Sequence, residues 1–283
     1  MAQVREIPAC LVRQTVKELC IEANTRLPHG LCRAVQAARE TERSPVGQAI
    51  LADMEENFTF ARERGLPICQ DTGMAVVFVD WGQDCRLTGD TLEGAVNAGV
   101  ADGYVEGLLR LSTVADPLRR ANTGDNTPAI LHLRMVAGDG VDITVAPKGF
   151  GSENMSSLKM FNPSVSQRQV EDHIVEAVSR AGSNPCPPVI VGVGLGGTSE
   201  AAALLAKRAL LRPVGESHPD PFYREMEGRL LERINALGIG PQGLGGTTTA
   251  LQVSILAMGT HIAGLPCAVN LGCHVTRHAH RRL

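Results

Sequence analysis

The sequence has few aromatic residues and no long apolar run. Phe, Trp and Tyr make up 3% of its 283 residues, with a single Trp. We find no stretch of about 18 apolar residues that could span a bilayer. The first residues, MAQVREIPACLVRQ, lack the apolar segment of a secretory signal peptide. We therefore expect a cytoplasmic protein that has no membrane partner.

The sequence also lacks an excess of charge of one sign. It has 27 Lys and Arg against 30 Asp and Glu, for a formal net charge of −3. No basic patch stands out, which argues against nucleic acid or an anionic membrane as a partner. The apolar fraction of 43% is ordinary for a globular protein. A chain of this length can bury a sizeable core.

The eight cysteines contain no CxxC pair. Structural zinc sites usually bring their ligands in close pairs, so a zinc framework is not indicated. Thiols in the cytosol stay reduced, and a disulfide framework is therefore not expected. Taken singly, each cysteine could be a small buried apolar residue. Spacing alone does not tell which cysteines are exceptions.

Apolar periodicity predicts a mixed α/β fold. Residues 1–65 read as a helical region, and residues 66–283 read as an α/β body with small sheets enclosed by helices, all within one domain. In that body, the strands at 130–136 and 141–145 are joined by Ala137-Gly138-Asp139-Gly140, which predicts a hairpin. The other expected elements are strands at 74–79 and 187–194 and helices at 92–111, 170–181, 199–211 and 221–237.

Glycine-rich segments suggest a possible nucleotide module. Gly192–Gly197 matches GxGxxG between an expected strand and an expected helix. The acidic residue that should follow about 20 positions later would be Glu216, but it lies in a proline-rich loop. The segment LGGT also occurs twice, at 195–198 and 244–247. The two copies are either helix-opening turns that bind a common anion or unrelated tight turns.

Five further segments combine polar groups with cysteine, glycine or proline. CQDTG at 69–73 precedes an apolar strand, and the prolines of NPCPP at 184–188 hold Cys186 on a stiff segment. NTGDNTP at 122–128 and KGFGSEN at 148–154 are donor-rich loops that would suit a ligand, although ordinary connections look the same. LGCH at 271–274 places a thiol beside imidazoles, as either a reactive site or a solvated basic tail. His274 and His278 could also form part of a zinc scaffold.

These segments, together with GLGGT, resemble the iron–sulfur class of fumarate hydratases, specifically their catalytic N-terminal region or α subunit. The motifs occur in order from about residue 66 to residue 274. The α subunits of L-tartrate dehydratases are similar around CQDTG and CPPV. The resemblance implies that residues 1–283 form the catalytic domain of a hydro-lyase that interconverts fumarate and L-malate, a reaction of the tricarboxylic acid cycle. L-Tartrate or a related dicarboxylate is the alternative substrate.

The resemblance also implies a [4Fe-4S] cluster held by Cys69, Cys186 and Cys273. Three thiolates leave one iron open, and that iron can act as a Lewis acid on the substrate hydroxyl. Gln70 would then bind substrate. Asp71 would serve as the acid or base that moves a proton, with orientation of a water as its alternative role.

Three further residues match substrate-binding positions of the family. His261 would be a catalytic residue that contacts substrate, although a histidine in an apolar segment is ordinarily a core residue. Arg110 would pair with a carboxylate, or else interact with the end of its helix. Gly151 would offer its backbone N–H to the other carboxylate.

Single-chain members of the family continue into a second domain that supplies further side chains to the site. We therefore expect a separate β subunit and an oligomeric assembly. The chain alone should bind the cluster but turn over poorly. A dinucleotide-binding module and a zinc scaffold remain the alternatives from other classes.

Overall fold

The computed structural model describes residues 4–283, which form two compact units. Unit 1 contains residues 4–28, 60–149 and 277–283, and unit 2 contains residues 29–59 and 150–276. The predicted mixed α/β class is confirmed. Within the described residues, no helix has the length and apolar character needed to cross a membrane.

The predicted helical region is confirmed, with one strand added ahead of it. Helices α1 (Ala9–Thr25), α2 (His29–Thr41) and α3 (Pro45–Arg64) cover most of this region. Strand β1 (Arg5–Pro8) was not predicted, and it pairs in parallel with β3 (Cys85–Thr88). The four residues of β1 pair with a strand about 80 positions away, so the local sequence pattern gives little indication that they form a strand.

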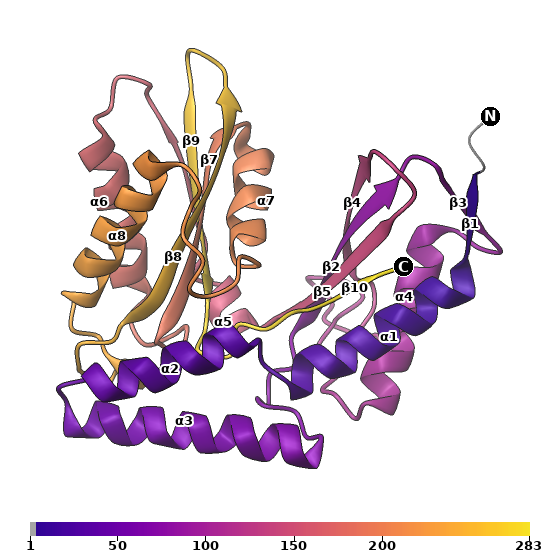
Figure 1. Ribbon diagram of the computed structural model, residues 1–283, viewed down its shortest axis with the longest axis horizontal. Coiled ribbons are helices and arrows are strands. Elements are labelled where there is room, and N and C mark those ends of the chain that lie inside the picture. Colours follow the sequence, from indigo (N-terminus) through magenta and orange to yellow (C-terminus); the bar gives the residue numbers. More distant parts are fainter. Residues whose placement is uncertain (1–3) are drawn as a thin grey trace. The chain divides into compact units, whose positions relative to one another are not determined.

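Unit 1 is a four-stranded sheet with helices on one face (Figure 1). Helix α1 and helix α4 (Leu92–Glu106) pack against each other and against the sheet. Alternate residues of the second strand, from Ala75 to Trp81, enter this core. The strand order is β10 (Ala279–Arg282), β5 (Val141–Lys148), β2 (Met74–Gly82) and β4 (Ile130–Val136).

The predicted hairpin between β4 and β5 is wrong. Both strands exist, but β2 lies between them, parallel to β4 and antiparallel to β5. The turn that joins them therefore passes over the end of β2, where Gly82 N–H donates to the Gly140 carbonyl at 2.9 Å. Strand β2 takes the central position because its residues are almost all apolar and buried, as a strand covered on both faces requires.

Unit 2 is a second four-stranded sheet, with helices on both faces (Figure 1). Helices α6 (Gln167–Ala181) and α8 (Pro221–Asn235) share an apolar core with one face. Helix α7 (Ser199–Ala209) packs on the other face. The strand order is β6 (Ser157–Phe161), β9 (Leu265–Gly272), β7 (Val189–Gly197) and β8 (Ala250–Thr260).

The glycines of the GxGxxG segment lie inside β7, so they do not form the turn that the nucleotide-binding alternative requires there. They let α7 approach the strand closely. A methyl group on Gly192 would lie 2.2 Å from the Ala206 carbonyl oxygen, and one on Gly194 would lie 2.0 Å from that of Ala202. Distances under 3 Å leave no room for a side chain, so these glycines serve helix–strand packing.

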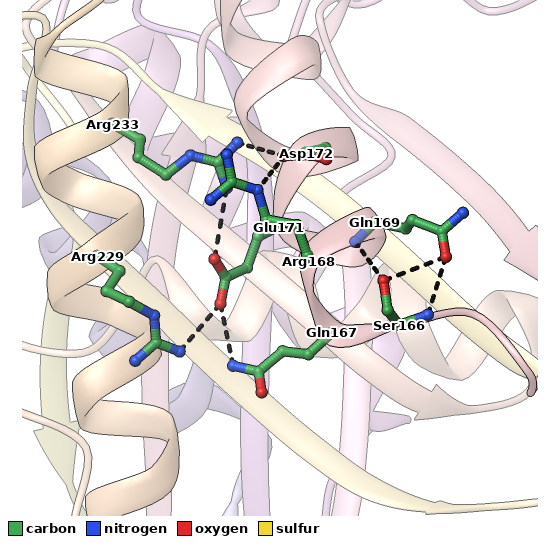
Figure 2. A network of polar contacts seen from close by, with 8 residues as sticks. All are labelled: Ser166, Gln167, Arg168, Gln169, Glu171, Asp172, Arg229 and Arg233. Carbon is green, nitrogen blue, oxygen red and sulfur yellow. Dashed lines mark hydrogen bonds and ion pairs between the residues drawn. The ribbon is translucent and has the colours of Figure 1, made fainter.

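Charged side chains join α6 to α8, as Figure 2 shows. The buried carboxylate of Glu171 accepts from Arg229 at 3.0 Å and from Arg233 at 3.4 Å. Arg233 also binds Asp172, and this hydrogen bond lowers the pKa of the Asp172 carboxyl. Because both arginines pair with the buried Glu171, its negative charge is compensated where the two helices meet.

Helix α6 begins with a capping box, which Figure 2 also shows. Ser166 N–H donates to Gln169 Oε1 at 2.9 Å, and Gln169 N–H donates to Ser166 Oγ at 3.3 Å. The two residues therefore satisfy N–H groups that the first helical turn would otherwise leave without partners.

The second LGGT copy encloses a carboxylate of the chain itself, within unit 2. Glu42, which is 2% exposed, accepts from Thr247 N–H, Thr248 N–H and the Thr247 hydroxyl at 2.8–3.0 Å. A strand follows this loop, so the second copy does not open a helix, and of the two alternatives the structure favours unrelated turns. Burial alone would raise the pKa of Glu42, but hydrogen bonds from Ser44, Thr247 and Thr248 outweigh it and lower the pKa to about 2.

Candidate active site

The CQDTG loop leads directly into β2 in unit 1, and hydrogen bonds hold its last residues. The hydroxyl of the buried Tyr104 donates to the Thr72 carbonyl at 2.9 Å and lies 3.0 Å from that of Gly73. At the other end of the loop, the Cys69 thiol lies 3.3 Å from Gln70 Oε1, and Cys69 is half-buried. The loop is thus fixed at Thr72 and Gly73, with the predicted site residues just before them.

Arg110 lies against this loop. Its backbone N–H donates to Thr72 Oγ1 at 2.9 Å, and the Thr72 hydroxyl is 3.2 Å from the Arg110 carbonyl oxygen. Helix α4 has already ended at Glu106, and the Arg110 side chain is exposed. The structure therefore brings two predicted segments together, the CQDTG loop and the predicted carboxylate-binding arginine.

Asp71 lies between these groups and the KGFGSEN segment. Its Oδ1 accepts from Gly73 N–H at 3.0 Å. A methyl group on Gly149 would lie 3.1 Å from Asp71 Oδ2, so the start of the second motif faces this carboxylate. The buried Arg277 donates to the Asp71 backbone carbonyl at 2.5 Å. These contacts fix the carboxylate and its peptide in one orientation.

The NTGDNTP segment supports the loop from inside the protein. Asn126 is fully buried, and its Oδ1 accepts from Ser112 N–H at 2.7 Å and Thr113 N–H at 3.1 Å. Its Nδ2 donates to the Gly73 carbonyl at 3.1 Å. The backbone of Asn126 is left-handed at φ 63°, which Asn tolerates better than most residues. This motif thus joins the Arg110 segment to the CQDTG loop.

Unit 2 brings Cys186 and Cys273 into neighbouring segments. His274 follows Cys273, and its N–H lies 3.3 Å from the Cys186 carbonyl oxygen. The His274 ring atom Nδ1 is 3.0 Å from the same oxygen. Gln242, in the turn η1 (Pro241–Gly243), contacts the Pro187 carbonyl and the His274 ring. Two chain segments 88 residues apart are therefore joined at the two predicted cysteines.

Gly151 lies close to the same segment of unit 2. It belongs to the short helix α5 (Phe150–Glu153) and is exposed. A methyl group on Gly151 would lie 3.2 Å from the Asn184 carbonyl oxygen, two residues before Cys186. The predicted carboxylate-binding N–H is therefore next to one of the predicted ligand loops.

His261 lies elsewhere in unit 2. It is exposed in the turn between β8 and β9, where Ala263 N–H donates to its Nδ1 at 3.1 Å. That turn lies beside the last residue of β7, since the Thr260 hydroxyl donates to the Gly197 carbonyl at 3.0 Å. Cys186 precedes the first residue of β7, and Cys273 follows Gly272, which pairs with Ile190 near the same end of this strand. His261 therefore lies at the opposite end of β7 from the two cysteines.

Comparison with known proteins gives one consistent result. The family model described as "Fumarate hydratase (Fumerase)" matches residues 13–282. The chain belongs to this family. It is 38% identical, over 96% of its length and 97% of the relative's, to a "Putative L(+)-tartrate dehydratase subunit alpha" of Methanocaldococcus jannaschii. It is 35% identical to the L(+)-tartrate dehydratase subunit alpha of Escherichia coli K12, over 92% of this chain and 85% of the relative.

A thiol that binds metal must be accessible, and the three predicted cysteines meet this condition. Cys186 is exposed, and Cys69 and Cys273 are half-buried. By contrast, burial raises the pKa of both Cys20 and Cys267 to about 12, which disfavours the thiolate that binds metal. Cys85 is also a poor candidate, because its thiol contacts the Asp139 carbonyl at 2.9 Å and burial raises its pKa.

Cys69 lies in unit 1, and Cys186 and Cys273 lie in unit 2. Thiolates are the donors that an iron–sulfur cluster requires. Within residues 4–283, no group of three or more His, Cys, Asp or Glu side chains forms a metal site by itself.

Sequence reasoning missed three residues that organise this candidate site of the fumarate hydratase family. The sequence marks Thr72 only as part of the CQDTG motif, yet its hydroxyl accepts from the Arg110 N–H. Asn126 was part of a polar loop and is a buried hydrogen-bonding centre. Gln242 was not singled out at all, although the glycine and proline around it marked a turn. A polar residue inside such a turn was the available signal.

Proposed function

We propose that the chain is the α subunit of an iron–sulfur hydro-lyase that interconverts fumarate and L-malate. The observation that carries this proposal is the joining of the Cys186 and Cys273 segments in unit 2. In unit 1, a third accessible thiol, that of Cys69, belongs to the CQDTG loop that also carries Asp71, and the Arg110 backbone binds Thr72 of this loop. Membership of the fumarate hydratase family supports the reaction class.

The cysteines Cys69, Cys186 and Cys273 would hold a [4Fe-4S] cluster, which supplies Lewis acidity toward the hydroxyl group of the substrate. The remaining roles fall to the chain's own polar groups. Gln70 would donate a hydrogen bond to substrate, because its amide precedes the fixed Asp71 peptide. Arg110 would pair with one carboxylate of the substrate, since its side chain is exposed while its backbone is held. Gly151 would give its N–H to the other carboxylate.

Asp71 is the proposed proton-transferring group. Its carboxylate is oriented by Gly73 N–H and faces Gly149, so it would present one defined oxygen to the substrate. His261 would contact substrate from a different part of the assembly, because within unit 2 it lies at the far end of the sheet from the cysteines.

We also propose a separate β subunit that completes the site. The relatives in Methanocaldococcus jannaschii and Escherichia coli are both named as alpha subunits of a dehydratase. A partner would supply the further cationic side chains that a dicarboxylate needs. The chain alone is then expected to bind the cluster and to turn over slowly, in an oligomer once the partner is present.

L(+)-Tartrate is the second candidate substrate, and the names of these relatives favour it. Anaerobic co-expression with the candidate partner, followed by assays with fumarate, L-malate and L(+)-tartrate, separates the two. The preferred substrate should have a kcat/KM at least about tenfold above that of the other, because one hydroxyl group differs between L-malate and tartrate. Hydration of fumarate slower than dehydration of tartrate would favour the second candidate.

The cluster assignment has its own test. Anaerobic reconstitution with iron and sulfide should give a brown chain with broad visible absorption. Replacing Cys69, Cys186 or Cys273 by Ser should remove that absorption, whereas Cys10→Ser and Cys20→Ser should retain it. If the control variants behaved like the other three, the ligand assignment would be wrong. Zinc without acid-labile sulfide would favour a scaffold instead.

A further inference from the structure

Two consecutive backbone carbonyls at Cys186 each face two hydrogen-bond donors. The Cys186 carbonyl lies 3.3 Å from the His274 backbone N–H and 3.0 Å from His274 Nδ1. The next carbonyl, that of Pro187, accepts from Gln242 N–H at 2.8 Å and from Gln242 Nε2 at 3.1 Å. Each of two residues therefore uses both its backbone and its side chain on one peptide oxygen.

Cys186 needs such support because its backbone conformation is unfavourable. Its φ is 52°, in the left-handed region that residues with a Cβ rarely adopt. The prolines on both sides of Cys186 remove backbone N–H donors that could otherwise fix the segment. The Cys186 N–H itself donates to the Ser183 carbonyl at 3.0 Å. The carbonyl side of the peptide is therefore held from outside the segment.

The two donor residues also contact each other. Gln242 Nε2 lies 3.2 Å from His274 Nδ1. The ring of His274 stacks on Phe58, with ring centroids 6.5 Å apart. Because Nδ1 faces the Cys186 carbonyl, the hydrogen-bond network assigns its proton to that nitrogen. With that proton assignment, Gln242 Nε2 donates to the Pro187 carbonyl and not to the ring, so the imidazole is oriented by the Cys186 carbonyl and by Phe58.

Gln242 reaches the cysteine segment from a loop that is fixed on its other side. Gly240 N–H donates to Thr249 Oγ1 at 3.2 Å, and Asn235 Oδ1 accepts from Thr249 N–H at 2.9 Å. Further along, the backbone of Thr247 is bound to Glu42. Because the loop of Gln242 is fixed in this way, the Gln242 side chain can determine the position of the Pro187 carbonyl that it binds.

We propose that Gln242 and His274 are positioning residues that set the geometry of the Cys186 and Cys273 thiols toward a bound metal group. This inference rests on the proposed function. His274 adjoins the Cys273 thiol and binds the carbonyl oxygen of Cys186. Gln242 binds the next carbonyl oxygen of the same segment, that of Pro187. Residues that orient metal ligands in this way typically change metal affinity 10- to 100-fold when they are replaced.

The test uses the full chain, reconstituted anaerobically, and follows the visible absorption after a chelator is added. Gln242→Met and His274→Phe keep side-chain volume but remove the side-chain donors, so both should lose the absorption about ten times faster than the wild type. His274→Gln keeps a donor and should bring the rate to within about twofold of wild type. Gln252→Met is the matched control, because Gln252 binds Gly215, Pro213 and Ser254 instead.

A second readout needs no metal. Hydrogen exchange of the apo chain should show faster exchange at the His274 amide in Gln242→Met than in wild type, with no change there in Gln252→Met. A wild-type chain that takes up no iron and sulfide would overturn the proposed function. If the wild type takes up the cluster but Gln242→Met and His274→Phe release it at the wild-type rate, the positioning role is overturned alone. Unchanged exchange at His274 would overturn it as well.

Discussion

Thr72 and Arg110 bind each other through one hydroxyl group. The Thr72 Oγ1 atom accepts from the Arg110 N–H at 2.9 Å and lies 3.2 Å from the Arg110 carbonyl oxygen. Thr72 is 2% exposed, so no water replaces this hydroxyl easily. The guanidinium of Arg110 is therefore carried by a backbone whose position depends on the CQDTG loop.

Replacing Thr72 by Val should weaken substrate binding without touching a charged group. The variant keeps the shape of the side chain but leaves the Arg110 N–H without its acceptor. We expect KM of the complete enzyme to rise about tenfold, and the free energy of unfolding to fall by about 1–2 kcal/mol. Steady-state kinetics and urea denaturation measure the two effects. Thr72→Ser keeps the hydroxyl and should stay near wild type; an unchanged KM in Thr72→Val would contradict a binding role for Arg110.

Asn126 should be among the residues whose loss costs most in unit 1. Asn126→Ala leaves the N–H groups of Ser112 and Thr113 and the Gly73 carbonyl short of a partner. It also places alanine in a left-handed backbone conformation. We expect a loss of about 3 kcal/mol in urea denaturation. Asn126→Asp keeps the oxygen that accepts from Ser112 and Thr113, but it sets a buried carboxylate oxygen against the Gly73 carbonyl, so it should also destabilise the protein. Near wild-type stability of both variants would contradict this role of Asn126.

Acid should weaken the contact between Glu42 and its loop. The pKa of Glu42 is about 2 in the folded chain and near its ordinary value of 4.5 when unfolded. Because the folded value is the lower one, the stabilisation is complete above about pH 4.5 and is lost as the pH falls toward 2. The difference corresponds to about 3 kcal/mol.

The measurement is urea denaturation as a function of pH for wild type and Glu42→Gln. The variant should be about 3 kcal/mol less stable at pH 7, and the difference should shrink below pH 4. A constant difference from pH 7 to pH 2.5 would mean that the carboxylate charge does not contribute.

Helix α7 should not tolerate a side chain on the strand beneath it. Gly194→Ala would place a methyl group 2.0 Å from the Ala202 carbonyl oxygen, so the helix must move. We expect a loss of about 3 kcal/mol or more. Gly228→Ala is the control, since a methyl group there meets nothing within 4 Å and should add about 0.5–1 kcal/mol to helix α8. Thermal denaturation of both variants checks the contrast, and a neutral Gly194→Ala would contradict the packing role.

The sequence predicted elements well where the apolar pattern was local. Strand β2 was expected within a few residues of its observed bounds because it is a short, almost wholly apolar run, and helices α6, α7 and α8 because each buries one continuous apolar face. The pairing of β4 and β5 was not predictable in the same way. Insertion of β2 between two strands that are adjacent in sequence is decided by which strand is apolar on both faces.

The candidate site was predictable where short motifs carried it. Asp71 and Arg110 lie about 40 residues apart in sequence, yet both were singled out and both lie at the CQDTG loop. Glu42 and Gln242 carried no such signal, since their importance comes from partners in distant segments. A glutamate in a polar turn looks ordinary until the loop that surrounds it is known.

The enclosure of Glu42 has a consequence for small anions in solution. A loop of glycine and threonine N–H groups would ordinarily attract phosphate or sulfate. Here the Glu42 carboxylate, which belongs to the same chain, already occupies these N–H groups, at an effective concentration in the millimolar range or above. Dissolved oxyanions at ordinary buffer strength should therefore neither displace it nor protect the protein from heat through this loop.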